Sequence, residues 1–424
     1  MENFNTTDAS QKTLIYPFYT IFGSLFPKIN FILLFHLLSL VFDLILCLVI
    51  LFCSYLFLKN YYYSLLALVL IGLGGGLGWA IKMSADINMP GITFFSSFQR
   101  PHDALSSCFY LLSLSLFYLS VKRGKHILSL ISLLFLLLII PFSPYRLLSY
   151  FMITALFAAI NYKNTATPSA FRYIAINLII TLPLGLAYYY HFSSSSYSSL
   201  LSYQPSPISI FSLILGWAPL LPIFIWQLMS KKSPAIYFLY IWFLVSFLLA
   251  LLPFGLARLF YGCSYFPLLV INLLFLQKLA KKDFANSLAL TIILFFFTLP
   301  SFFYIYAKRL EAIKEKNSWY YLPEELQDAF NFLEKQEKDG VLVLEPVNTY
   351  IPAFTGKKVY FGHKDQTPGY DEKTAKALAF YASGQNENEA KTFLQENNNQ
   401  QFPGPDYSFL QTVFNNNKVE ILSP

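Results

Sequence analysis

Long apolar segments are the feature that most constrains the fold of this chain. A helix that crosses a bilayer needs about 20 mostly apolar residues, and ten segments of the 424-residue chain come close to that length. They predict a mainly α-helical bundle of about ten spans, because helices satisfy their own backbone hydrogen bonds in lipid. The segments are residues 31–57, 61–80, 104–121, 126–141, 144–161, 172–191, 207–229, 235–257, 261–277 and 285–306.

Charge divides the chain into two parts. Only 12% of the residues are charged, about half the usual share of a soluble protein. Residues 1–306 hold 17 Lys and Arg but only 6 Asp and Glu, so basic residues dominate there. Residues 307–424 hold 13 Lys and Arg and 17 Asp and Glu, as a soluble domain would. We therefore expect a transmembrane domain over 1–306 and a small soluble α/β domain over 307–424.

The same charge pattern excludes several classes of protein. A cytosolic enzyme or a disordered chain would not carry this much apolar sequence. The basic residues flank the apolar segments instead of forming a phosphate-binding stripe, so we expect no nucleic-acid partner. The four cysteines form no C-x-x-C pair and all precede residue 307, so no disulfide framework or thiolate metal site is expected.

Basic residues in the connecting loops predict the orientation in the membrane. When the loops are assigned alternately to two sides, one side collects eleven Lys and Arg and the other collects six. The richer side includes VKRGKH at 121–126 and QKLAKKD at 277–283 and should be cytoplasmic. The domain after residue 306 would then be extracytoplasmic, on a multi-pass membrane protein.

The predicted orientation places residues 1–30 outside as well. The polar start MENFNTTDASQ resembles no signal peptide. A protein of this kind normally has one more span before such a start, so we expect that an ancestral first helix is missing from the chain.

The outside loops concentrate ionisable residues. The segment 81–103 follows the glycine-rich stretch GLGGGLGW and contains Lys82, Asp86, Arg100, His102 and Asp103. No GK[ST] follows these glycines, which argues against a P-loop.

Two further outside arginines, Arg146 and Arg258, lie at a span start and a span end. Each could be a solvated anchor at the membrane edge. Alternatively, Arg100, His102, Arg146 and Arg258 converge on the phosphate of a lipid-linked substrate, since arginine suits phosphate geometry.

His36 and Asp43 lie seven residues apart within an apolar segment, which places them on one face of a helix. An intramembrane carboxylate is a candidate functional group. The alternative that we favour from sequence is a buried polar contact between two helices.

The sequence after residue 306 alternates between helical and strand patterns. Helices are expected from Pro323 to about Gly340 and over 371–384, 387–396 and 406–414, and strands over 341–345, 359–361 and 418–422. The intervening loop 351–373 contains His363, Asp365 and Thr367. His363 could act as a base, or His363 and Thr367 could belong to a loop that packs over the mouth of the membrane domain.

Three stretches resemble a known superfamily: LIYPFYTIFGSLF at 14–26, GGGLGW at 74–79 with FFSSFQRPHDALS at 94–106, and IPAFTGKKVYFGHKDQT at 351–367. Their order is similar to that of GT-C membrane glycosyltransferases, in particular relatives of protein mannosyltransferases and of aminoarabinose transferases. Of the basic candidates, only Arg100 and His102 lie inside a matched stretch.

The resemblance implies transfer of a sugar from a polyprenyl-phosphate donor to an unknown acceptor on the outer face of the membrane. It also implies an acidic residue in a first outside loop that acts as a base or binds a divalent cation; no cofactor is otherwise expected. That loop would precede LIYPFY, where only Glu2 and Asp8 remain. Asp8 and Asp86 are the catalytic candidates.

Two other functions compete with glycosyl transfer. A non-catalytic or degenerate protein of the same fold would explain the missing first loop. A transporter of a lipid-linked precursor would require internal repeats and polar groups at mid-membrane, and the sequence shows no repeat. The sequence leaves the sugar, the lipid and the acceptor open.

Overall fold

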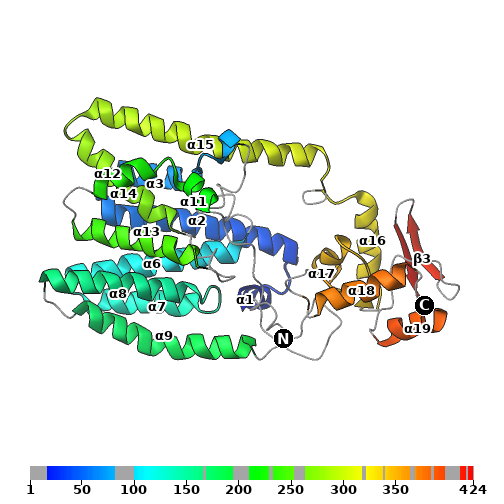
Figure 1. Ribbon diagram of the computed structural model, residues 1–424. Helices are drawn as coiled ribbons and strands as arrows, with labels where there is room; N and C mark the ends of the chain where they lie inside the picture. Colours follow the sequence, from blue (N-terminus) through cyan, green and yellow to red (C-terminus); the bar gives the residue numbers. More distant parts are fainter. Residues whose placement is uncertain are drawn as a thin grey trace.

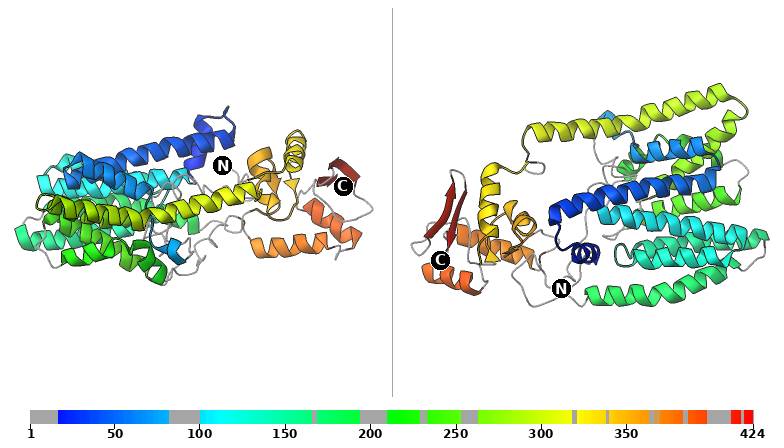
Figure 2. Two further views of the ribbon diagram at one scale, coloured as in Figure 1. Left: turned by 90° about the horizontal axis from the view of Figure 1, so that it is seen from above. Right: turned by 180° about the vertical axis from the view of Figure 1, so that it is seen from behind.

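A computed structural model describes residues 17–81, 100–165, 169–193, 210–228, 233–252, 263–317, 321–337, 340–362, 367, 369–382, 386–396, 411–416 and 419–423. Most of these residues are helical (Figure 1). The helices before residue 315 lie side by side in a bundle, and the remaining elements gather beyond one end of it (Figures 1 and 2).

The bundle is built from apolar helices and one short 3-10 turn, η1 (Gly78–Ile81). The helices are α1 (Pro17–Leu25), α2 (Phe31–Leu58), α3 (Tyr61–Gly72), α6 (Pro101–Arg123), α7 (His126–Ile139), α8 (Arg146–Thr165), α9 (Ser169–Ser193), α11 (Ile210–Trp217), α12 (Leu221–Leu228), α13 (Pro234–Ala250), α14 (Tyr265–Ala280) and α15 (Phe284–Lys314).

Four of the described helices are long and apolar enough to cross a membrane, namely α2, α6, α9 and α15. Five more apolar stretches have 10 to 17 residues: helices α3, α7, α13 and α14, and Arg146–Tyr162 within α8. The chain is therefore a helical membrane protein. The figure of about ten spans stays a prediction, because the shorter helices do not reach the usual spanning length.

Connections between the helices alternate between the two ends of the bundle (Figure 1). The starts of α2, α6 and α8 lie at the end that faces the C-terminal elements, whereas the α2–α3, α6–α7 and α8–α9 connections lie at the far end. We call the end of the bundle that faces the C-terminal elements the near end. Arg100 and Arg146 are therefore at the near end, and Lys59, Lys122 and Arg123 are at the far end. This arrangement matches the alternation that the basic residues predicted, although it does not say which end is cytoplasmic.

Helix α6 packs against several neighbours and carries much of the core. Its serines 106, 107, 113, 115 and 120 are all buried, which lets neighbouring backbones approach closely. The Tyr118 ring lies 5.2 Å from the Phe57 ring of α2. On the other side, Tyr110 and Ser149 of α8 share a hydrogen bond of 2.8 Å.

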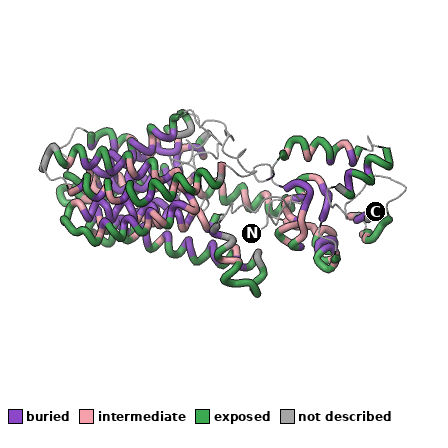
Figure 3. The backbone as a smooth tube through the Cα atoms, turned by 90° about the horizontal axis from the view of Figure 1, so that it is seen from below, coloured by how far each residue is buried: buried purple, intermediate pink, exposed green. Residues whose placement is uncertain are grey.

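The outer helices α9 and α15 have mostly exposed apolar faces. In the bundle as a whole, buried residues gather inside and exposed residues lie around them (Figure 3). In the most apolar 18-residue stretch of each helix, the share that is buried inside the protein is only 22% for α9 and 17% for α15. Exposed apolar side chains of this density are suited to lipid contact, because in lipid they carry no hydration cost.

The C-terminal elements form two small sheets with helices around them. β1 and β2 pair in parallel and β3 and β4 pair antiparallel. The elements are α16 (Glu324–Glu334), β1 (Gly340–Val341), η3 (Val347–Thr349), α17 (Ile351–Thr355), β2 (Lys358–Val359), α18 (Tyr370–Tyr381), α19 (Glu387–Glu396), β3 (Gln411–Asn416) and β4 (Val419–Ser423).

Two hydrophobic clusters lie within these elements. One gathers around Phe361, Phe380 and Leu394, and the other around Phe330, Val359 and Ile421. The boundary at residue 306 stays a prediction, because helix α15 runs continuously past it to Lys314.

The helix expected over 406–414 is wrong for residues 411–414, which belong to strand β3, and its first half lies outside the described residues. Thr412, Val413 and Phe414 favour an extended backbone, and β4 follows after a short connection and pairs with β3. The pairing of β3 with β4 determines the local structure here. The residue pattern of one segment alone does not show that a second segment will pair with it.

We predict that Tyr150→Phe destabilises the bundle. The Tyr150 hydroxyl is within 3.1 Å of the Ser132 hydroxyl and accepts a hydrogen bond of 2.9 Å from Asn177 Nδ2. Its removal leaves a buried amide donor without that partner, which costs about 1–3 kcal/mol. Thermal unfolding of the purified protein in detergent measures the loss, and Tyr62→Phe at an exposed position is the control. An unchanged midpoint for Tyr150→Phe would contradict this.

A candidate anion-binding site at the near end of the bundle

The first turn of α6 carries three ionisable residues. Arg100 precedes the helix, and Pro101 occupies its first turn, where a missing backbone N–H costs nothing. Arg100 Nη1 lies 3.8 Å from Asp103 Oδ2, and His102 Nε2 lies 3.8 Å from Asp103 Oδ1. Asp103 therefore holds two basic side chains beside each other at the end of the bundle.

Arg146 starts α8, next to this turn. The backbone N–H of Arg146 donates to Ser143 O at 3.0 Å, which closes the turn after the segment PFSP. Its Nη2 donates to Ser107 Oγ of α6 at 3.2 Å, and its guanidinium carbon lies 5.5 Å from the centre of the Tyr110 ring. The guanidinium is thus fixed against α6 from two directions.

Arg146 is buried yet incompletely paired. Only 7% of the residue is exposed, and Nη1 has no hydrogen-bond partner among the described residues. Burying an ion costs several kcal/mol unless its hydrogen bonds are satisfied. A solvated anchor would not be buried in this way, so the structure favours the interpretation of Arg146 as part of a ligand site.

The basic residues act on one another electrostatically. The charges of Asp103, Arg100 and Arg146 all act on His102. Asp103 also interacts with Arg146. Arg146 therefore joins Arg100, His102 and Asp103 in one group, in which two guanidinium groups accompany a single carboxylate and leave the excess of positive charge that an anion site requires.

Aromatic rings of α1 cover this group. The Phe18 ring lies 6.3 Å from His102, 5.6 Å from Phe42 of α2 and 5.8 Å from Phe142. Phe22 also lies 5.5 Å from Phe42. The rings exclude water from the inner side of the site, which strengthens electrostatic interactions there.

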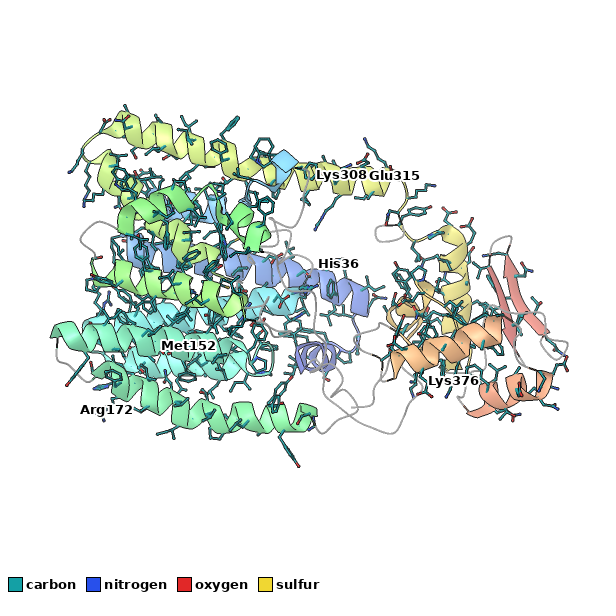
Figure 4. All side chains as sticks on the ribbon, viewed as in Figure 1. His36, Met152, Arg172, Lys308, Glu315 and Lys376 are labelled. Atoms are coloured by element: carbon teal, nitrogen blue, oxygen red, sulfur yellow. The ribbon has the colours of Figure 1, made fainter. Side chains whose placement is uncertain are left out.

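Asp43 and His36 occupy different environments although they share a helix face. His36 is on the exposed part of α2 that extends toward the C-terminal elements (Figure 4), whereas Asp43 is only 6% exposed. Neither oxygen of Asp43 has a hydrogen-bond partner among the described residues. The helix-to-helix contact favoured from sequence therefore has no visible partner in the described part of the chain.

The remaining predicted site residues are not brought to this group. Thr367 is 5% exposed and its hydroxyl accepts a hydrogen bond of 2.9 Å from the backbone N–H of Gly362. It closes a loop among the C-terminal elements. Asp8, Asp86, Arg258 and His363 lie outside the described residues, so their roles stay predictions.

Among the described residues, no three His, Cys, Asp or Glu side chains come together as metal ligands. Sequence reasoning missed Ser107 and Tyr110, which hold Arg146. The sequence signal was a shared spacing of 39 residues, between Ser107 and Arg146 and between Tyr110 and Ser149. This spacing becomes informative only when α6 and α8 are known to run side by side.

Comparisons with known proteins place the fold. The chain resembles three crystal structures of an oligosaccharyltransferase from Archaeoglobus fulgidus. One is a complex with zinc and sulfate, with a TM-score of 0.58, 12% identity and 95% of this chain covered. The apo form has a TM-score of 0.55 and 13% identity, with 92% of this chain covered. A form tethered to an acceptor peptide containing the NVT sequon has a TM-score of 0.54 and 14% identity, with 95% of this chain covered.

The likeness is one of fold. The GT-C superfamily that the sequence motifs indicated, and its mannosyltransferase or aminoarabinose transferase subtype, therefore stay predictions. The chain spans 60%, 61% and 62% of the length of these three proteins. No protein-family profile and no curated protein matches the chain in sequence.

We predict that Arg146→Met leaves the free energy of unfolding within about 1 kcal/mol of the wild-type value, because replacing a poorly satisfied buried ion with an apolar side chain is often neutral or stabilising. Chemical unfolding in detergent measures the change. If Arg146 served only to hold the bundle together, its loss would cost about 3–5 kcal/mol, and that result would contradict a ligand site.

Proposed function

We propose that this protein is an integral membrane glycosyltransferase that moves a sugar from a polyprenyl-phosphate donor to an acceptor on the outer face of the membrane. The buried guanidinium of Arg146, with its unpaired Nη1 and its neighbours Arg100 and His102, is the observation that carries the proposal. The fold of an oligosaccharyltransferase supports it.

The chemistry requires charge stabilisation at one place. As the acceptor oxygen attacks the anomeric carbon, the bond from that carbon to the phosphate oxygen breaks and negative charge develops on the lipid phosphate. Cations already held in position stabilise this charge without reorganisation. Arg146 takes this role from inside the bundle and Arg100 takes it from the end, where His102 adds a hydrogen-bond donor.

A carboxylate accepts the proton of the acceptor in this reaction. Asp8 and Asp86 are the proposed candidates, and Arg258 is proposed to add to the phosphate site. The crystal structure of the fold neighbour with zinc and sulfate makes a divalent cation at such a carboxylate a reasonable addition.

The position of the C-terminal elements fits an outer-face site. α17 packs on α2 beside the near end of the bundle (Figure 1), where Arg100 and Arg146 lie. We propose that this end is extracytoplasmic, in a bacterial cytoplasmic membrane, and that the loop with His363 and Thr367 lies on the acceptor side.

Transfer of radiolabelled sugar from polyprenyl-phosphate donors in membranes tests the proposal. Arg146→Ala is expected to lower the rate about 100-fold or more, as loss of one preorganised donor to a developing anion does elsewhere. Arg172→Ala, at the far end of the bundle (Figure 4), is the matched control and should retain activity.

Equal rates for Arg146→Ala and wild type would contradict the assigned role. Binding of the donor lipid without transfer by the wild type would favour the non-catalytic alternative.

A further inference from the structure

Asp43 and Arg146 lie at nearly the same depth in the bundle. The Phe57 ring of α2 lies 5.2 Å from the Tyr118 ring of α6, and the two helices run in the same direction. This register of 61 residues places Asp43 level with residue 104 of α6.

Arg146 occupies a similar level on a neighbouring face of α6. The contacts of Arg146 with Ser107 and of Ser149 with Tyr110 give a register of 39 residues between α8 and α6. Arg146 is therefore level with residue 107. At 1.5 Å of rise per residue, the two charged residues differ in depth by about 3–5 Å.

Both residues lie near the first turns of α6. The Phe18 ring packs against Phe42, the residue before Asp43, and against His102 of α6, while Arg146 donates to Ser107 of the same helix. No ion pair between them is present among the described residues, and each keeps polar atoms without a partner: both Asp43 oxygens and Arg146 Nη1. Two buried, opposite and separately unpaired charges suit a ligand that bridges them.

We propose that Asp43 accepts hydrogen bonds from hydroxyl groups of the sugar ring whose phosphate is bound by Arg146. A carboxylate with two free oxygens can take two neighbouring hydroxyl donors, and in a glycosyl phosphate these hydroxyls and the phosphate belong to one rigid group. The inference rests on the proposed function, because it takes the lipid-linked sugar phosphate as the ligand of Arg146.

Two alternatives for Asp43 explain less. A contact between helices would give its oxygens a partner, and none is seen in the described part of the chain. A metal ion would need further protein ligands, and no cluster of three is found among the described residues.

A ligand that reaches Asp43 must pass the aromatic rings of α1. Phe18 lies against both Phe42, which precedes Asp43, and His102. A ligand that contacts both charged groups must displace this ring.

Binding measurements with the full-length protein in detergent test the inference. The probes are farnesyl phosphate and its mannosyl and glucosyl esters. The wild type should bind at least one ester about tenfold more tightly than farnesyl phosphate, the gain expected from one charge-assisted hydrogen bond. Asp43→Asn should bind farnesyl phosphate as the wild type does and lose the preference for the ester.

Matched variants separate a binding role from a folding role. Ser39→Ala, one turn earlier at another buried position of α2, should keep the preference. Arg146→Gln should weaken binding of all three probes. If Asp43→Asn is not monodisperse on gel filtration, Asp43→Ser replaces it in the same comparison.

Each outcome decides between the two claims. If Asp43→Asn keeps the preference, or the wild type has none, the role of Asp43 is wrong and the phosphate site at Arg146 stands. If the wild type binds neither farnesyl phosphate nor its esters, the proposed function fails as well.

Discussion

The buried guanidinium of Arg146 is the interaction on which this account depends. A cation inside an apolar bundle is costly unless its donors are satisfied, and here Ser107 Oγ and the Tyr110 ring satisfy it only in part. The turn PFSPY before α8 and the serine-rich start of α6 set the position of the side chain. The site is thus a consequence of how two parallel helices are aligned.

Alignment of helices also explains why Arg100, His102 and Arg146 form one group. α6 and α8 both start at the end of the bundle that faces the C-terminal elements (Figure 2). A cation at the start of either helix is therefore near the other. The same alignment brings Asp43 to the level of Arg146. The Asp43 carboxylate can accept hydrogen bonds there, and the Arg146 guanidinium can donate them.

Hydrophobic segments were sufficient to predict a mainly helical fold. The shared phosphate site of Arg100, His102, Arg146 and Arg258 stays a prediction, which rests on the confinement of span ends on one side of a bundle to one layer. The burial of Asp43 and the exposure of His36 did not follow from the sequence. They depend on α2 extending beyond the start of α6, which is set by packing between helices. The strand over 411–416 was missed for a related reason, because its partner β4 is a separate segment.

Photo-crosslinking with a polyprenyl phosphate that carries a diazirine next to its phosphate is the most direct test of the anion site. The account predicts labelled peptides from the starts of α6 and α8, over residues 100–110 and 143–150, and loss of this labelling in Arg146→Gln. Labelling confined to the far end of the bundle, around residues 59–61, 122–126 or 278–283, would contradict it.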